Sequence, residues 1–529
     1  MTRTGRPTTL AYNGMIATPH SLASAAGLEV LQEGGTAADA IIAANAVLTV
    51  IYPDQTAIGG DAYLLYYEAA TGQLHALNGT GRSAAKADRE ALRHAGYTSM
   101  PRRGIHSVTA PGTIDAWFTI NDRFGKLGID RLLQPAIGYA ANGFPLSPNV
   151  RSSLHFAQDY PGFDDEFRKV YLPDGRVPAA GSKIRLPLLA GTLQRVATEG
   201  RSLFYEGEIA AKIVATSQRL GGAFTLDDLA NHHAEWVEPV LTDYHGVTVA
   251  EFPPNSQGIT AQIALNLVEN RPDAEWGSAD HLHPLIEAKK LAFAVRDREL
   301  GDPAFTPIDV QRLVSKEFAA SLWEQYNPSR AQMGTIDVAG DTVYLCAVDA
   351  DGNAASLIQS IYLGFGSGVL AGDTGVLLQC RGAYFSLDDH HPNRLEGGKR
   401  TLHTLMPGML LKDGELMGPI GTQGGDAQAQ VHLQLITNLV DYGMDPQEAI
   451  EAPRWVAGGP EPDRPLFVEF ESRFDPATIA ELESRGHDVV VGDNFNPNFG
   501  HAQMILRDPV SGLLRGGADP RADGVAIGI

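Results

Sequence analysis

The residue whose type and position most clearly suggest chemistry is Thr342, which follows a linker-like segment and opens an apolar run, Val343–Val348. If its backbone nitrogen were freed, this threonine would carry a nucleophilic hydroxyl and a basic amine in one residue. The reference pKa of an α-amine, about 7.7–8.0, leaves part of it neutral near pH 7, so that it can act as a general base. We therefore expect the chain to be cut between Asp341 and Thr342. The alternative is that Thr342 is an ordinary β-branched strand residue.

The segments on either side of Thr342 predict a hairpin that would hold it. The sequence Asp351-Gly352-Asn353 separates the run Val343–Val348 from a second apolar run, Ala354–Ile361. Asp-Gly and Gly-Asn between apolar runs are typical of a tight turn between two strands. The preceding segment, 327–341, contains Pro, Gly and Ser with little periodicity, which indicates an exposed linker suited to cleavage.

Further along the chain the patterns predict layers of helices and strands. Ser21–Glu33 is expected to be a helix that stops at Gly34-Gly35, and Thr36 with Asp39 predicts the capped start of a second, buried helix. The stretch 111–327 is mostly helical in spacing, whereas the chain after Thr342 is rich in strand patterns, including Gly375–Cys380. This order predicts a layered α+β fold.

Composition limits the classes of function. The chain has 529 residues, 43% of them hydrophobic, and a formal charge of −22, which argues against nucleic acid or an anionic membrane as partner. Its two cysteines do not form a disulfide framework, and its first residues lack the apolar core of a signal peptide. The longest apolar run, Ala40–Tyr52, is too short to span a bilayer. The cytoplasm is therefore the expected location.

Eight short stretches, taken together and in order, give the chain a family resemblance. It is similar to the γ-glutamyltransferase (γ-glutamyltranspeptidase) family of N-terminal-nucleophile hydrolases. That resemblance implies a four-layer αββα fold and a precursor that cuts itself into a large subunit, 1–341, and a small subunit, 342–529, which together form one unit. The stretches are Thr36–Ala40, Ile58–Asp61, Thr109–Thr113, Leu300–Pro303, Asp351–Asn353, Gly364–Gly368, Gly424–Asp426 and Asp519–Arg521.

The resemblance also implies roles for single residues. Thr342 would be the nucleophile, and Ser360 would be the hydroxyl that hydrogen-bonds it. Gly424 and Gly425 would supply the backbone N–H groups of an oxyanion hole, where a side chain would block the approach. Arg82 would clamp a substrate carboxylate with its forked guanidinium. The alternatives without a catalytic role are a solvent-facing strand serine for Ser360, an ordinary turn for the two glycines and a surface loop arginine for Arg82.

Five positions depart from the transpeptidase pattern. Tyr362 stands where the family has Asn, Arg381 replaces Gln, and Tyr384 replaces the acid that binds the substrate α-ammonium; His403 and Thr404 replace a pair of serines. These changes keep a cation for a carboxylate and remove the partner of an ammonium. They favour an acid without an α-ammonium, such as a glutaryl amide or oxamate. Chains with these features resemble cephalosporin (glutaryl) acylases and oxamate amidohydrolases.

We therefore predict a self-processing N-terminal-threonine amidohydrolase that cleaves γ-glutamyl or related acyl amides, with hydrolysis favoured over transpeptidation. Glutaryl (cephalosporin) acylase or oxamate amidohydrolase specificity is the first alternative, and an uncut, non-catalytic binding protein on the same fold is the second. The expected substrate is a small amide bearing a carboxylate, no cofactor or metal is implied, and the cut pair is compatible with a further dimer. Histidine pairs such as His232-His233 and His390-His391 lack further partners at ligand spacing.

Overall fold

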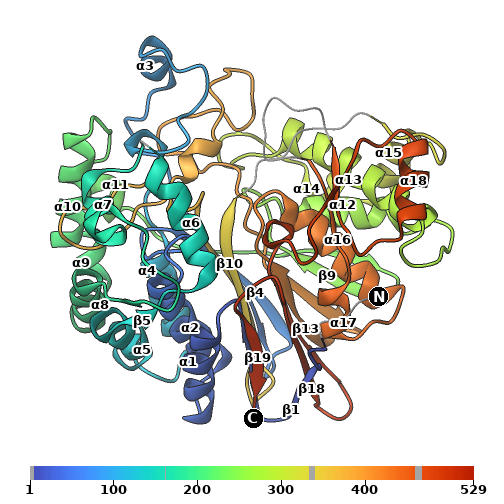
Figure 1. Ribbon diagram of the computed structural model, residues 1–529, viewed down its shortest axis with the longest axis horizontal. Helices are drawn as coiled ribbons and strands as arrows, with labels where there is room; N and C mark the ends of the chain where they lie inside the picture. Colours follow the sequence, from blue (N-terminus) through green and yellow to red (C-terminus); the bar gives the residue numbers. More distant parts are fainter. Residues whose placement is uncertain (1–4, 161, 333–339, 459–466) are drawn as a thin grey trace.

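Two stacked antiparallel sheets form the centre of the molecule, with helices on both outer faces (Figure 1). The structure is a computed structural model that describes residues 5–160, 162–332, 340–458 and 467–529. The first sheet has the order β19 (Val525–Gly528), β2 (Met15–Thr18), β10 (Asp341–Val348), β11 (Ala354–Tyr362), β3 (Asp61–Glu68), β4 (Gln73–Gly79) and β7 (Glu235–Val237). The second has the order β1 (Thr9–Ala11), β18 (Leu514–Ala518), β17 (Ala502–Arg507), β13 (Glu415–Thr422), β12 (Gly408–Lys412), β9 (Val247–Glu251) and β8 (Val240–Tyr244).

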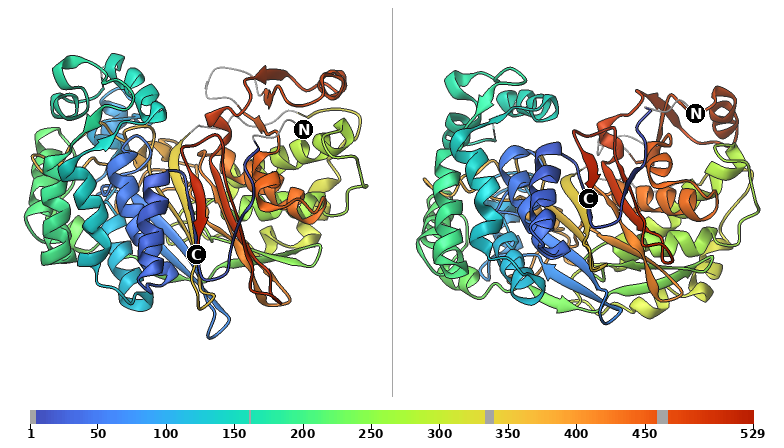
Figure 2. Two further views of the ribbon diagram at one scale, coloured as in Figure 1. Left: turned by 60° about the horizontal axis from the view of Figure 1, so that its bottom comes forward. Right: turned by 90° about the horizontal axis from the view of Figure 1, so that it is seen from below.

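The helices form one layer over each sheet, and Figure 2 shows both layers from two further sides. The first layer consists of α1 (Ser21–Gln32), α2 (Ala37–Ile51), α4 (Thr113–Phe124), α5 (Ile129–Asn142), α6 (Pro148–Asp159), α7 (Asp165–Tyr171), α8 (Pro187–Glu199), α9 (Arg201–Tyr205), α10 (Glu208–Arg219) and α11 (Leu226–Ala230). The second consists of α12 (Gly258–Val268), α13 (Ala279–Glu299), α14 (Val310–Leu313), α15 (Lys316–Trp323), α16 (Ala427–Val440), α17 (Pro446–Glu451) and α18 (Pro476–Ser484).

The remaining elements are small and lie outside these layers. They are α3 (Arg89–His94), the pair β5 (Phe144–Pro145) and β6 (Lys183–Ile184), and the three-stranded sheet of β14 (Trp455–Ala457), β15 (Val468–Glu471) and β16 (Val489–Gly492).

Three apolar layers hold this arrangement together. One contains α1, α2, α4 and α5 and the outer face of the first sheet; a second lies between the two sheets, where Tyr63, Tyr344 and Met409 are buried. The third joins the second sheet to α12, α13 and α16. A sheet or helix that buries one face must find a partner layer, and four such layers give the αββα order. The predicted fold class is confirmed.

The helix α2 shows how sequence dictates one of these layers. The Thr36 hydroxyl accepts a hydrogen bond from the Asp39 N–H, and the Asp39 carboxylate accepts one from the Thr36 N–H, which is the predicted capping box. Every residue of α2 is buried, as its apolar composition on all sides requires. The helix ends at Ile51, with Tyr52 as its C-cap, and the residues that follow place Gln55 beside Asp341 and Thr342 of β10.

The hairpin of β10 and β11 also follows from the sequence. Its turn is held by Asp349, whose carboxylate accepts hydrogen bonds from the N–H groups of Asp351, Asn353 and Ala37. One prediction near it is wrong: Gly375–Cys380 is not a strand, and Leu377 and Leu378 make only isolated bridges, to Leu370 and Gly59. A short buried apolar run has the same pattern whether it joins a sheet or packs beneath helices.

The segments before and after Thr342 are interleaved rather than side by side. Both sheets combine strands from 1–341 with strands from 342–529, so neither segment alone completes a sheet. The central part of the predicted linker, 333–339, lies outside the described residues. In the part of the chain that the structure describes, every helix is too short or too polar to cross a membrane.

Candidate active site

Thr342 lies at an irregularity near the start of β10. Asp341 pairs with Tyr362 of β11 and Val343 pairs with Gln359, so that the register shifts at Thr342. An extra residue in one strand re-aims the side chain at that point and is common beside active sites. Thr342 is 1% exposed, and its side chain points to Ser360.

The Ser360 hydroxyl uses all of its hydrogen-bonding capacity around the Asp341–Thr342 bond. It accepts hydrogen bonds from the Thr342 hydroxyl at 3.2 Å and from the Tyr362 N–H at 2.7 Å. It donates its proton to the Asp341 carbonyl oxygen at 2.5 Å. One donor and two acceptor positions are the full complement of a serine hydroxyl. The bond donated to Asp341 polarises the carbonyl that the Thr342 hydroxyl would attack.

Gln55 and Asp54 lie beside the Asp341–Thr342 bond, although the sequence analysis did not predict them as site residues. The Gln55 side-chain oxygen accepts the Thr342 N–H at 3.1 Å, and its Nε2 lies 3.3 Å from Asp341 Oδ1 and 3.2 Å from Asp54 Oδ2. Burial raises the pKa of Asp341 to about 7, with the charge of Asp54 adding to it and Arg103 opposing it. Burial raises the pKa of Asp54 as well. The signal that could have found them in the sequence is their place a few residues before the stretch Ile58–Asp61.

Gly424 and Gly425 form the turn between β13 and α16. Their φ angles are +132° and +56°, and the first lies in a region that only glycine adopts readily. A methyl group on Gly340 would lie 3.2 Å from the Gly425 Cα, which places the turn against the residue two positions before Thr342. The Gln257 side chain donates to the Gly425 carbonyl at 3.1 Å and accepts from Arg296 at 2.9 Å, which fixes the turn from behind.

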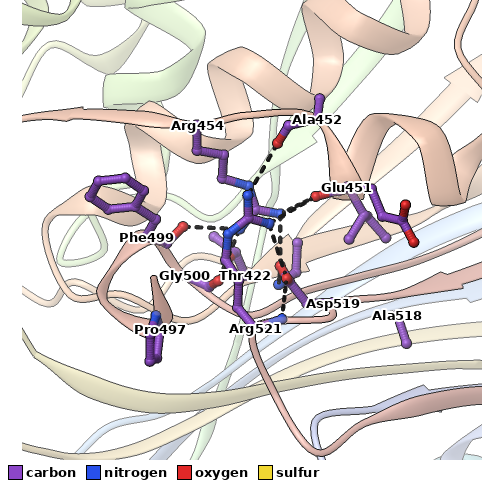
Figure 3. A network of polar contacts seen from close by, with 12 residues as sticks. Thr422, Glu451, Ala452, Arg454, Pro497, Phe499, Gly500, Ala518, Asp519 and Arg521 are labelled. Atoms are coloured by element: carbon purple, nitrogen blue, oxygen red, sulfur yellow. Dashed lines mark hydrogen bonds and ion pairs between the residues drawn. The ribbon is translucent and has the colours of Figure 1, made fainter. Parts of the chain in front are cut away.

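A network of buried charges supports the other side of this turn (Figure 3). Arg454 pairs with Asp519 at 2.7 Å, and its Nη1 donates at 2.9 Å to the carbonyls of both Phe499 and Gly500. Arg521 pairs with the same Asp519 at 3.1 Å. Burial alone would raise the pKa of Asp519, but Arg454 and Arg521 hold it at about 2.

This network reaches the glycine turn through Gly500. A methyl group on Gly500 would lie 2.6 Å from the Thr422 hydroxyl and 2.8 Å from the Gln423 carbonyl, so only glycine allows this approach. The Gln423 N–H also bonds the His501 carbonyl at 3.3 Å. Asp519 and Arg521 belong to one of the eight family stretches, yet the sequence alone did not assign them this contact.

The residues that depart from the transpeptidase pattern gather beside Tyr362. The Arg381 guanidinium lies 4.2 Å from the centre of the Tyr362 ring and donates to the Thr404 hydroxyl at 3.0 Å. The Tyr384 ring meets Tyr362 edge-on at 5.6 Å. His403 lies 3.2 Å from Asp61, and burial, with the charge of Arg381, holds the pKa of His403 well below its usual range.

Two cavities open on this region. One of about 560 Å³ is lined by Tyr362, Tyr384, Arg102 and Asp426, among others. The other, of about 390 Å³, is lined by Asp341, Gln55, Gly424, Arg103 and further polar residues. Clefts of this size suit a small polar substrate.

Arg82 makes its contacts with other residues than those around Tyr362. Its side chain is 37% exposed, and its guanidinium pairs with Glu235 at 3.2 Å and lies 3.6 Å from Asp302. It also donates to the Gly398 carbonyl at 3.4 Å. The structure therefore brings together the other predicted site residues and leaves Arg82 in an ion-pair cluster of its own. Its role as a carboxylate clamp stays a prediction, and Arg381 is the arginine beside Tyr362.

One histidine cluster has the geometry to hold a metal ion. The ligand atoms of His283, Glu287 and His487 lie within 4.8 Å of one another. Glu287, however, is paired with Lys290 at 2.7 Å, and its second oxygen accepts the Gln332 N–H at 3.1 Å. The His283 Nδ1 and His487 Nε2 atoms lie 2.8 Å apart, at hydrogen-bonding distance, so most of the ligand atoms already have partners; His487 Nδ1 has none among the described residues.

Comparison with known proteins decides the family. Residues 23–529 match the sequence model described as Gamma-glutamyltranspeptidase. The chain belongs to this family. A glutathione hydrolase-like proenzyme (YwrD) of Bacillus subtilis is 42% identical over 97% of this chain and 98% of its own length. An oxamate amidohydrolase proenzyme of Klebsiella pneumoniae is 38% identical over 98% of each chain.

Solved structures agree with the γ-glutamyltranspeptidase assignment. The crystal structure of a cephalosporin acylase from Bacillus halodurans covers 100% of this chain and 98% of its own, with 38% identity and a TM-score of 0.93. The predicted family, the N-terminal-nucleophile fold and the class of enzyme, an amidohydrolase of the glutathione hydrolase type, are confirmed. The acyl donor and the role of Thr342 stay predictions.

Proposed function

We propose that this γ-glutamyltranspeptidase family member is a precursor that cuts itself between Asp341 and Thr342 and then uses Thr342 to hydrolyse amides. The observation that carries the proposal is the Ser360 hydroxyl, which links the Thr342 hydroxyl at 3.2 Å to the Asp341 carbonyl oxygen at 2.5 Å. The products of cleavage are 1–341 and 342–529. Relatives named proenzymes support this division of the chain.

Self-cleavage proceeds by transfer of one acyl group. The Thr342 oxygen attacks the Asp341 carbonyl carbon, the C–N bond breaks, and the Thr342 nitrogen takes up the proton that the hydroxyl loses. The resulting ester joins Asp341 to the Thr342 side chain. Water then hydrolyses the ester, which leaves a carboxylate on Asp341 and restores the Thr342 hydroxyl beside a free α-amine.

The same atoms then serve an external amide. The Thr342 amine accepts the hydroxyl proton during attack and returns it to the leaving amine, and water hydrolyses the acyl ester. Gln55, which accepts the Thr342 N–H at 3.1 Å in the uncut chain, would orient the amine after cleavage. The turn of Gly424 and Gly425 would face the oxyanion. Hydrolysis is favoured over transfer to an amine acceptor.

The donor is proposed to be a γ-glutamyl amide or a related acyl amide that carries a carboxylate. Relatives include a glutathione hydrolase-like proenzyme, an oxamate amidohydrolase and a cephalosporin acylase, which support glutaryl or oxamate specificity as the alternative. No cofactor enters the proposed reaction.

A denaturing gel of freshly made protein, with mass spectrometry of its bands, tests the proposal. We expect two fragments, with Thr342 as the first residue of the smaller one, and a single band for Thr342→Ala. Thr242→Ala on β8 is the matched control, because Thr242 is also a buried strand threonine. A wild-type chain that stays intact and inactive would favour the non-catalytic binding protein, and normal cutting of Thr342→Ala would exclude Thr342 as nucleophile.

A further inference from the structure

Arg381 is a buried cation whose hydrogen-bonding groups are only partly used. The residue is 1% exposed, and its Nη1 donates to Thr404. Its Nε and Nη2 have no hydrogen-bond partner among the described residues. A buried charge with unused donors is costly unless a partner compensates it, so such a group points to an anionic ligand.

The acids around Arg381 compensate it incompletely. Among the described residues, no carboxylate forms an ion pair with it, and Asp61 is the acid whose charge acts on it from farther away. The Asp61 oxygens are already engaged by the Gly81 N–H at 2.9 Å, by Gln379 at 2.8 Å and by His403 at 3.2 Å. Burial raises the pKa of Asp61 to about 7, so that near neutral pH its charge is only partial. The charge of the Arg381 guanidinium is therefore only partly balanced by these acids, and its Nε and Nη2 remain available to a further anion.

Tyr384 stands where the transpeptidases have the acid that binds the substrate α-ammonium, and its surroundings do not favour a cation. The Tyr384 hydroxyl donates to Asp426 at 2.7 Å, and Arg296 pairs with the same Asp426 at 2.6 Å. The carboxylate beside Tyr384 is therefore already neutralised by a guanidinium. A substrate α-ammonium placed beside Tyr384 would have to share Asp426 with Arg296 and would also lie near the charge of Arg381, which is unfavourable.

We infer that Arg381 binds the carboxylate of an acyl donor that has no α-ammonium, such as a glutaryl amide. This inference rests on the proposed function of Thr342 and names the substrate class of that site. Tyr362 lies opposite Asp341 in the pairing of β10 with β11, so the guanidinium stacked on its ring is close to the bond that Thr342 would attack. A guanidinium fork suits a carboxylate in two parallel hydrogen bonds.

Access to Arg381 is controlled by Tyr362. Its ring covers the guanidinium, and its backbone has a φ of +78°, which is strained for a residue with a large side chain. A methyl group on Gly340 would lie 3.3 Å from two carbons of the same ring, so the uncut chain packs against it. Cleavage before Thr342 would free the chain at Gly340, and we expect the Tyr362 ring then to be able to move from Arg381. Cutting and substrate access are thus coupled.

The test compares three donors with one leaving group on the cut enzyme: glutaryl-, γ-glutamyl- and pentanoyl-p-nitroanilide. Pentanoyl replaces the glutaryl carboxylate with a methyl group. We expect kcat/KM for glutaryl to exceed that for pentanoyl on the order of 10²-fold or more, because a site built for a polar group rejects the analogue that lacks it. We expect glutaryl to match or exceed γ-glutamyl.

Arg381→Gln should collapse the glutaryl-to-pentanoyl ratio to below about 10, and Arg381→Lys should leave an intermediate ratio, because a lysine keeps the charge without the fork. Arg400→Gln is the matched control: Arg400 is also buried, but its Nε bonds Thr80 and its Nη1 bonds Glu235, both at 3.0 Å. It should leave the ratio unchanged even where total activity falls. The ratio is insensitive to a general loss of folded enzyme.

An unchanged ratio in Arg381→Gln, or a wild-type preference of about 100-fold for the γ-glutamyl donor, would overturn the inference. These outcomes can be distinguished from failure of the proposed function. In that case the cut enzyme would turn over none of the three donors, or Thr342→Ala would turn them over normally. Labelling with phenylglyoxal, read by peptide mass, tests access. Arg381 should react in the cut enzyme, be protected there by glutarate, and stay unreactive in uncut Thr342→Ala. Equal labelling of both forms would exclude the role of Tyr362.

Discussion

Arg381, beside Tyr362, and the pair Arg454 and Arg521, behind the glycine turn, are buried arginines that differ in how far their charges are compensated. Arg454 and Arg521 share Asp519, and both Nη atoms of Arg454 bond carboxylate or carbonyl oxygens. Arg381 has one hydroxyl partner and an aromatic ring. Both groups are buried, so they differ in the partners of their guanidinium groups and not in their exposure to water.

This difference separates a structural role from a binding role. A buried guanidinium that pairs with a carboxylate and donates to several carbonyls holds backbone segments together, as both Nη atoms of Arg454 do behind the glycine turn, although its Nε has no partner among the described residues. A buried guanidinium with unused donors destabilises the free protein, and a bound anion would offset that cost. The rest of the fold must be stable enough to tolerate it. Three further experiments test whether the two kinds of arginine differ in this way, because the structural role predicts a loss of stability and the binding role a loss of activity.

The largest effect on stability is expected from Arg454→Met. It leaves Asp519 buried with one partner fewer and frees two carbonyls, which should lower the free energy of unfolding by about 3–5 kcal/mol. Arg381→Met should change it by only about 1 kcal/mol, because no buried carboxylate loses an ion-pair partner. Thermal unfolding of both variants in the uncut Thr342→Ala chain measures the difference. Equal losses would remove the distinction between the two arginine groups.

A smaller effect, on rate rather than stability, is expected from Gly424→Ala. The φ of +132° excludes alanine, so the turn that the Arg454 network supports must shift. We expect kcat to fall on the order of 10²-fold, the usual cost of losing an oxyanion donor, with KM changed much less. Gly443→Ala serves as control, since Gly443 also has a positive φ, +61°, in open space. Similar kcat losses in both variants would place the oxyanion site elsewhere.

The smallest effect concerns the carboxyl pair Asp54 and Asp341, where compensation is again incomplete. Because the pKa of Asp341 is raised from 3.8 to about 7, the folded chain binds this proton more tightly than the unfolded chain. Its contribution to stability is therefore present at low pH and is lost as pH rises from about 4 to about 7. Adding Asp341→Asn to the uncut Thr342→Ala chain should raise the melting temperature more at about pH 8 than at about pH 5. A shift that is the same at both values would contradict this.

Local sequence signals predicted a large part of the fold. The capping box of Thr36 and Asp39, the turn after Val348 and the apolar character of α2 are short-range patterns, and each has the structure expected of it. The prediction of a strand at Gly375–Cys380 was wrong, because an apolar, buried pattern does not reveal whether the edge of a neighbouring strand is free to pair with it. Arg82 illustrates the same limit in the site, since nothing in its local sequence reveals that Glu235 and Asp302 lie beside it.

The family, the layered fold and Thr342 as the proposed nucleophile could be predicted from the sequence, because these depend on motifs and periodicities that each occupy a few consecutive residues. Only the tertiary structure decided which side chains surround that threonine. Gln55 reaches Thr342 across 287 positions, and Asp519 holds Arg454 behind the glycine turn across 65. It also decided that Arg381, rather than Arg82, lies beside Tyr362 with unused donors. Hydrogen bonds and desolvation act over a few ångströms in space, whatever the separation along the chain, so a linear pattern does not encode their partners.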